Sequence, residues 1–265
     1  MTAAYEVPLT ATLATGIEMP MVGLGTWQLR GQTAYDSTRS ALEAGYRHID
    51  TATMYGNEAE VGRAIRDARL ERPEVFVTTK LPPERAGRER ETIAASLRAL
   101  GTDYVDLWLV HWPPRRPRAR ARTWSEFLAI RDEGLARAVG VSNYSVEQID
   151  ELLNVSAEKP DVNQVPWNPF RHDPPLLAAH RERGTLLEGY SPFKRTRLDD
   201  PTLDAIASAH GVSPAQVVLR WHLQHGIPVI PRSTNAARIR ANFDVFGFAL
   251  SVEETGRIDA LSSKA

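Results

Sequence analysis

Residues 75–111 read VFVTTKLPPERAGRERETIAASLRALGTDYVDLWLVH, which is the pattern of a strand, a helix and a second strand. Val75–Thr79 and Val105–Val110 are apolar runs of strand length with polar or glycine-containing flanks. Between them, Glu89–Leu100 spaces its apolar residues three and four apart and is followed by Gly101, as in an amphipathic helix that ends on glycine. This stretch therefore predicts one βαβ unit with parallel strands.

The same alternation runs along the whole chain and predicts about eight such units. Further strands are expected at Met21–Gly25, Tyr46–Asp50, Ala138–Val141, Val162–Val165, Thr185–Tyr190 and Pro228–Ile230. Further helices are expected at Thr33–Ala44, Glu58–Leu70, Trp124–Glu133, Val146–Asn154, Leu176–Arg183, Pro201–His210, Pro214–His225 and Val252–Leu261. Eight units in 265 residues predict a single-domain (β/α)8 TIM barrel over residues 1–265. The alternating segment Val7–Ile17 is expected to form an N-terminal β-hairpin that plugs the barrel floor.

A doubly wound open sheet is the rival architecture. A dinucleotide-binding domain of that type carries G-x-G-x-x-G between its first strand and first helix. Residues 23–28 read GLGTWQ and lack the third glycine, so the barrel is favoured.

Composition excludes several classes of protein. The chain is 42% hydrophobic and 25% charged, which is typical of a globular protein and not of a disordered one. Its formal net charge of -1 provides no general attraction to nucleic acid or to a membrane surface. There is no cysteine, so disulfides and thiolate chemistry are excluded. Residues 1–12 do not resemble a secretory leader, and we expect a cytoplasmic protein.

Four chemically active residues are expected at one rim of the barrel. In this fold the catalytic groups lie at the carboxyl ends of the strands. Asp50, Lys80 and His111 close three successive strands, and Tyr55 follows in the loop after Asp50. Each has an ordinary structural explanation as a cap, a salt bridge or a packed side chain. Together they suit proton transfer to a carbonyl oxygen, with tyrosine as the acid and lysine lowering its pKa from about 10.

The order of the motifs resembles the aldo-keto reductase superfamily, from about residue 6 to residue 262. The resemblance rests on Gly23-Leu-Gly-Thr-Trp27, His48-Ile-Asp-Thr-Ala52, Tyr55-Gly-Asn-Glu58, Val77-Thr-Thr-Lys80, Asp103-Tyr-Val-Asp106, His111-Trp-Pro113, Gly140-Val-Ser-Asn143 and Ile230-Pro-Arg-Ser-Thr234. The prokaryotic branch that includes the 2,5-diketo-gluconate reductases is the most similar.

The resemblance implies reduction of a small aldehyde or ketone by NADPH, bound without a Rossmann domain. It implies that Tyr55 is the general acid, that Lys80 paired with Asp50 tunes the phenol, and that His111 orients the carbonyl. The implied cofactor contacts are Ser142, Asn143, Gln164, Tyr190, Ser191, Arg232, Ser233, Thr234, Arg238 and Asn242. The three pocket candidates are Trp27, Trp112 and Trp167, of which the first two match pocket positions of the family. A monomer is the expectation at the level of the family.

Several positions depart from the pattern of the family. Ala241 stands where glutamate is usual near the adenine, which puts the strictness of NADPH over NADH in doubt. Pro166–Pro169 replaces a stretch that commonly begins with an acidic residue. The arginines of Arg115–Arg122 either form a solvated charged loop or attract an anionic carbonyl compound to the pocket. The chain ends soon after residue 261, which predicts an open pocket.

Two other functions remain as alternatives. A non-catalytic NADPH-binding regulatory subunit would be distinguished by the absence of turnover. A lyase that forms a Schiff base on Lys80 would be trapped by borohydride. His222 and His225 lie one helical turn apart, but the sequence fixes no carboxylate or third histidine near them, so no metal site is predicted.

Overall fold

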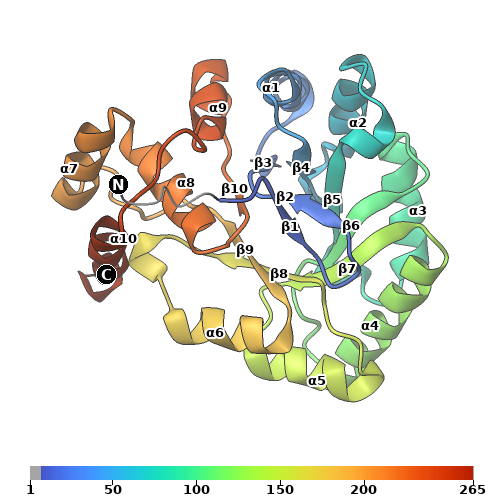
Figure 1. Cartoon of the computed structure of the whole chain (residues 1–265). Coiled ribbons are helices and arrows are strands. Elements are labelled where there is room, and N and C mark those ends of the chain that lie inside the picture. The colour runs from blue at the N-terminus through green and yellow to red at the C-terminus, as the bar shows by residue number, and fades with distance from the viewer. Residues whose placement is uncertain (1–6, 265) are drawn as a thin grey trace.

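Eight parallel strands form a barrel inside a ring of helices (Figure 1) in the computed structural model, which describes residues 7–264. The strands follow one another in chain order around the sheet. The first and last meet through a parallel bridge between Val22 and Val229 and through the amide of Gly25, which donates to the Pro231 carbonyl at 3.1 Å. The barrel strands are β3 (Leu24–Gly25), β4 (His48–Asp50), β5 (Phe76–Leu81), β6 (Val105–Val110), β7 (Ala136–Ser142), β8 (Val162–Pro166), β9 (Leu186–Tyr190) and β10 (Val229–Ile230).

Helices connect the strands and cover the outside of the barrel, which confirms the predicted (β/α)8 fold. Two helices, α7 and α8, lie between β9 and β10, and α9 follows β10. In the described part of the chain no helix has the length and hydrophobicity needed to cross a membrane. The helices are α1 (Gly31–Glu43), α2 (Glu58–Asp67), α3 (Glu89–Leu100), α4 (Pro117–Asp132), α5 (Val146–Ser156), α6 (Pro174–Arg183), α7 (Pro201–His210), α8 (Pro214–Gln224), α9 (Ala236–Phe243) and α10 (Val252–Asp259).

The N-terminal hairpin is present, but it lies further along the chain than Val7–Ile17. Its antiparallel strands are β1 (Thr10–Thr12) and β2 (Glu18–Pro20), joined by a turn in which Gly16 adopts a φ of +80°. Leu13 and Met19 of the hairpin are buried in one cluster with apolar side chains of the barrel strands, which also includes Phe76, Leu107, Leu109, Ala138 and Val162. This packing agrees with the prediction that the hairpin closes the barrel floor.

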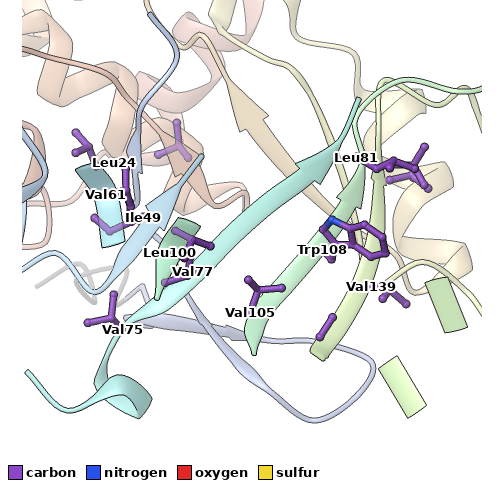
Figure 2. Close-up of a cluster of buried hydrophobic side chains, with 14 of the residues drawn as sticks. Leu24, Ile49, Val61, Val75, Val77, Leu81, Leu100, Val105, Trp108 and Val139 are labelled. Carbon is purple, nitrogen blue, oxygen red and sulfur yellow. The ribbon is translucent and has the colours of Figure 1, made fainter. Parts of the chain in front are cut away.

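The larger apolar core lies between the strands and the helices. Alternate side chains of a strand point to opposite faces, so Leu107 and Leu109 face the barrel interior while Trp108 faces the helices. Figure 2 shows Trp108 and Val139 on adjacent strands of this outer core. Trp108 stacks on Phe127 of α4 with ring centroids 3.9 Å apart. Burial of the outer faces of the strands holds the helices in place, and the strand ends are therefore rigid supports for a site.

Two helices differ from the sequence-based expectation. Helix α4 begins at Pro117 and not at Trp124, because proline suits the first helical position and the arginines that follow are good helix formers. Helix α9 was not predicted as a helix. The side chain of Asn235 caps it by accepting a hydrogen bond from the Arg238 amide at 3.0 Å. Helix α9 packs against both α8 and α1 and so completes the ring.

The contact between α2 and α3 depends on Gly62. A Cβ atom at this position would lie 2.1 Å from the carbonyl oxygen of Leu100, and the backbone there cannot move aside easily. We expect Gly62→Ala to lower the free energy of unfolding by about 1–3 kcal/mol, measured by urea titration. Gly256→Ala is the matched control, since Gly256 lies in α10 with nothing within 4 Å of the added methyl group. The control should gain about 0.5–1 kcal/mol from helix propensity. Equal effects of the two substitutions would contradict this account of the packing.

Candidate active site

The carboxyl ends of the barrel strands surround a cavity of about 620 Å³. Strand-end residues from around the barrel line it, among them Gly25, Asp50, Gln164, Tyr190 and Ile230. In (β/α)8 barrels the loops at this end of the strands form the active site. The cavity is therefore the candidate active site.

Asp50 and Lys80 form a buried ion pair at the base of the cavity. The Lys80 Nζ donates to Asp50 Oδ1 at 2.6 Å, to Asp50 Oδ2 at 2.7 Å and to the Thr51 carbonyl at 2.9 Å. Burial lowers the pKa of Lys80, but the nearby Asp50 and Tyr55 outweigh burial and raise it. A protonated amine with three acceptors is not a nucleophile, which argues against Schiff-base chemistry on Lys80.

Tyr55 lies between the buried ion pair and the open cavity, in a short 3-10 turn (Thr53–Tyr55). The Nζ of Lys80 is 5.3 Å from the centroid of the Tyr55 ring. The rings of Trp27 and His111 stand edge-on to it, with centroids at 5.1 and 5.6 Å. Burial raises the pKa of Tyr55, while Lys80 lowers it as expected and offsets part of that rise. The phenol keeps its proton at neutral pH and is available as a donor.

His111 comes directly after β6 and is 8% exposed. Burial lowers the pKa of His111 to about 3, with a further contribution from the positive charge of Lys80. Its Nδ1 atom is buried without a hydrogen-bond partner among residues 7–264. His111 is therefore a neutral imidazole that can hydrogen-bond a ligand without changing its charge.

This depressed pKa predicts acid sensitivity. The unfolded chain binds a proton at His111 below about pH 6.5, whereas the folded chain does so only near pH 3. Stability from this residue is thus complete above pH 6.5 and is lost as the pH falls below it. Between pH 7 and 5 we expect the free energy of unfolding to fall by about 2 kcal/mol more in the wild type than in His111→Asn. Urea titrations of both proteins at the two pH values measure the difference, and parallel profiles would contradict a neutral His111.

Polar groups on the next three strands form a connected rim. The Ser142 hydroxyl donates to the Gln164 carbonyl at 2.8 Å, and the Tyr190 hydroxyl donates to Asn143 Oδ1 at 2.8 Å. The Asn143 amide donates to the His111 carbonyl at 3.0 Å. These contacts fix the side chains before any ligand binds, which lowers the entropic cost of recognition.

Glu188 lies beneath this rim and was missed in the sequence analysis. The Gln164 amide donates both to Asp50 Oδ2 and to Glu188 Oε2, each at 2.8 Å. Burial, followed by the charge of Asp50, raises the pKa of Glu188 to about 8. A lone glutamate inside the apolar strand Leu186–Tyr190 was the available signal, because such a residue is rarely buried without a partner.

The structure brings most of the predicted site residues to this one cavity. Of the four catalytic candidates only Lys80 lies behind the wall, bonded to Asp50. The cavity is also lined by residues that the sequence analysis did not single out, namely Gln28, Met54, Pro192, Phe193 and Lys194. The predicted residues that line the cavity are Trp27, Asp50, Tyr55, His111, Trp112, Ser142, Asn143, Gln164, Tyr190, Ser191 and Arg232.

The remaining predicted cofactor residues lie beyond the cavity, toward α9. Ser233 and Thr234 precede the helix, and Arg238 is exposed in its first turn. Asn242 lies near the end of α9 and is 6% exposed. Thr234 and Arg238 are exposed, so they add polar surface beyond Arg232.

One expectation about the substrate pocket is wrong, and one of the two alternatives left open for the arginines is not supported. Trp167 is 1% exposed and packs edge-on against His172 in a separate apolar cluster, so it does not line the cavity. The arginine-rich segment is not a pocket loop, since most of it belongs to α4 and none of Arg115–Arg122 lines the cavity. Arg120 is buried and pairs with Glu151 at 2.6 Å, which is a structural contact.

Comparisons with known proteins all identify the same family. The Aldo/keto reductase family model matches residues 21–263. An aldo-keto reductase of Mycolicibacterium vanbaalenii is 42% identical over 264 residues, which cover 98% of this chain and 94% of the relative. The morphine 6-dehydrogenase of Pseudomonas putida is 42% identical over 267 residues, covering 95% of this chain and 90% of the relative.

Solved structures agree with these relatives. An aldo/keto reductase from Brucella melitensis superposes with a TM-score of 0.93 at 40% identity, covering 96% of this chain and 99% of that chain. A Bombyx mori aldo-keto reductase in complex with NADP superposes with a TM-score of 0.90 at 35% identity, covering 97% and 93%.

Proposed function

Since the chain belongs to the aldo/keto reductase family and is an oxidoreductase, we propose that it reduces aldehydes or ketones with NADPH and that Tyr55 is the general acid. One observation carries this proposal. A protonated phenol, a neutral imidazole and a buried Asp50–Lys80 pair meet at the wall of one cavity. These are the groups needed to polarise and protonate a carbonyl oxygen.

The rim residues fit a nicotinamide cofactor. Gln164 donates both amide protons to the carboxyl groups of Asp50 and Glu188, so its Oε1 is left to accept a hydrogen bond from a carboxamide, with Ser142 and Asn143 beside it. The ring of Tyr190 would stack on the nicotinamide, with Ser191 adjacent. The bound cofactor would supply the hydride that reduces the carbonyl carbon. Its 2′-phosphate and adenine would be held by the cations and polar groups around α9, which are Arg232, Ser233, Thr234, Arg238 and Asn242.

The other side chains would donate the proton to the carbonyl oxygen of the substrate and hold that oxygen in place. Tyr55 Oη would give its proton to the carbonyl oxygen, so that the reduced product is an alcohol. Lys80 stabilises the phenolate that remains, and Asp50 holds Lys80 in position. His111 donates a hydrogen bond to the same oxygen while remaining neutral. Trp27 and Trp112 are each about half exposed and would contact the carbon chain of the substrate.

The proposal extends to features that family membership leaves open. We place the chain in the prokaryotic branch similar to 2,5-diketo-gluconate reductases and propose a single-domain monomer that acts in the cytoplasm. A regulatory subunit without turnover is not favoured, because all four residues proposed for the reaction are present and connected.

Loss of NADPH absorbance in the presence of an aromatic aldehyde tests the proposed activity. We expect turnover with NADPH and much weaker turnover with NADH at the same concentration. A folded protein that binds NADPH without turning over any of several aldehydes and ketones would contradict the proposal.

The preference for NADPH is expected to depend on Arg238. A guanidinium–phosphate contact contributes about 1.5–3 kcal/mol, so Arg238→Ala should weaken NADPH binding roughly 10- to 100-fold and leave NADH binding unchanged. Arg240→Ala is the matched control, since Arg240 is exposed on the same helix but is not among the proposed contacts. Titration of protein fluorescence with each nucleotide measures the affinities. Equal weakening of both nucleotides would contradict a 2′-phosphate contact at Arg238.

A further inference from the structure

A cluster of two histidines and an aspartate lies outside the candidate active site, where three segments of the chain meet. His225 caps the end of α8, Asp259 ends α10, and His172 follows the short turn Pro169–Arg171 after β8. The His225 Nε2 is 2.9 Å from Asp259 Oδ1, and the His172 Nε2 is 3.6 Å from the same oxygen. One donor atom from each residue falls within 4.8 Å of the others. The helices α8 and α10 can be located in Figure 1.

These separations suit a divalent transition metal. Zinc binds histidine nitrogen and carboxylate oxygen at about 2.0–2.2 Å in tetrahedral sites, so neighbouring ligand atoms lie roughly 3.3 Å apart. The two distances to Asp259 Oδ1 fall on either side of that value, and all three ligand atoms lie within 4.8 Å of one another, so a small inward movement completes the site. Two imidazoles and a carboxylate match the ligand preferences of zinc, while magnesium prefers a shell of oxygens.

His172 is the observation that favours a ligand over a simple hydrogen-bond cluster. Its side chain is 5% exposed, yet it makes no hydrogen bond within residues 7–264, and its Nδ1 is buried without a partner. Buried polar groups normally have partners, and leaving one unpaired is costly. The Nε2 atom faces Asp259 at 3.6 Å, beyond hydrogen-bond distance, so a metal bound there would give one of the two ring nitrogens a partner while Nδ1 stays buried and unpaired.

The surroundings resemble the outer shell of a metal site. The indole of Trp221 donates to Asp259 Oδ1 at 2.7 Å, and hydrogen bonds of this kind orient ligating carboxylates. His222, the other histidine of the helical pair, does not take part. Its nitrogens lie 2.7 Å from the Val218 carbonyl and 3.1 Å from the Trp167 carbonyl, in the buried core. The sequence analysis could not identify a carboxylate and a further imidazole near His225. In the structure these are Asp259 and His172, which come from distant segments of the chain.

We propose that His172, His225 and Asp259 bind one divalent transition-metal ion, with zinc as the expected ion. Asp259 is 31% exposed and His225 is 18% exposed, so a fourth position can be filled by water. The ion joins α8 and the C-terminal helix α10 to the segment after β8. That segment is held close to the cavity, because the Asn168 amide donates to the carbonyl of the cavity residue Lys194 at 3.1 Å. Bound metal therefore stabilises the folded chain and restrains this part of the rim.

Calorimetric titration of the full chain with zinc chloride tests the site. We expect one ion per wild-type chain, no binding of magnesium, and a rise of about 5 °C in the thermal midpoint at saturating zinc. His172→Gln and Asp259→Asn keep the bulk of the side chains and should each weaken zinc binding at least about 10-fold. Circular dichroism confirms that each variant is folded before it is titrated.

His210→Ala is the matched control. His210 also pairs with a carboxylate of α10, at 2.9 Å from Glu254 Oε1, but it is not part of the three-residue cluster. Zinc binding should be unchanged in this variant. The proposal is overturned if the wild type binds no zinc, or if folded His172→Gln or Asp259→Asn binds it as tightly as the wild type. Since activity is not the readout, the result is independent of the proposed reductase function.

Discussion

Tyr55→Phe is expected to reduce kcat for aldehyde reduction by NADPH about 10²- to 10⁴-fold, the usual contribution of a positioned general acid. The substitution removes only the phenolic oxygen and leaves the ring packed against Trp27 and His111. Because burial raises the pKa of Tyr55, its proton is present throughout the neutral range and no other residue replaces it. Initial rates over a range of aldehyde concentrations, with saturating NADPH, measure the loss.

Tyr35→Phe provides the matched control for this substitution. Tyr35 is on α1, where its hydroxyl donates to Asp67 at 2.8 Å, away from the cavity. Its replacement should leave kcat within about twofold, since surface changes of this type are small. The affinity of Tyr55→Phe for NADPH should also be unchanged. A Tyr55→Phe enzyme that turns over as fast as the Tyr35→Phe control would remove Tyr55 from the role of acid.

Lys80→Met is expected to damage both activity and stability. It leaves the Asp50 carboxylate buried, with a hydrogen bond from the Gln164 amide at 2.8 Å but without its cation. Breaking a buried ion pair from one side costs about 3–5 kcal/mol, because an uncompensated charge stays in the interior. The positive charge that would stabilise a Tyr55 phenolate is lost as well, so kcat should fall at least about 10²-fold. Urea titration and initial rates measure the two effects.

The double variant Asp50→Asn/Lys80→Met separates these effects. A neutral pair no longer leaves an unpaired charge, so a large part of the lost stability should return, while activity should not. The side-chain carbonyl introduced at position 50 can still accept a hydrogen bond from Gln164. If the single variant is as stable as the wild type, or the double variant regains activity, the charge pair does not act as described.

The order of the strands and the positions of most helices could be predicted from the sequence wherever the hydrophobic residues follow a clear periodic pattern. Val75–Thr79 and Val105–Val110 lie within or next to observed strands because buried parallel strands are continuous apolar runs. The hairpin was placed too early, since short strands at a barrel end have little periodicity of their own. The first two turns of α4 were missed because their arginines carry no apolar pattern, although Pro117 marks the helix start.

The catalytic candidates were predictable because strand ends converge at one rim. Asp50, Lys80 and His111 end successive strands, and the structure brings them together. Trp167 was misassigned because the sequence does not reveal which face of the segment after β8 turns inward. The raised pKa of Tyr55 was missed because burial is a property of the fold and not of the motif. The partners of His225 come from segments far away in the sequence, so no local pattern could identify them.

Isotope labelling shows directly whether the hydride passes from NADPH to the carbonyl carbon. The enzyme is incubated with benzaldehyde and NADPH carrying deuterium at both C4 positions, and the alcohol is analysed by mass spectrometry. We expect one deuterium on the carbinol carbon of each product molecule and no product above background from Tyr55→Phe over the same time. Alcohol that contains no deuterium, or equal yields from both proteins, would contradict it.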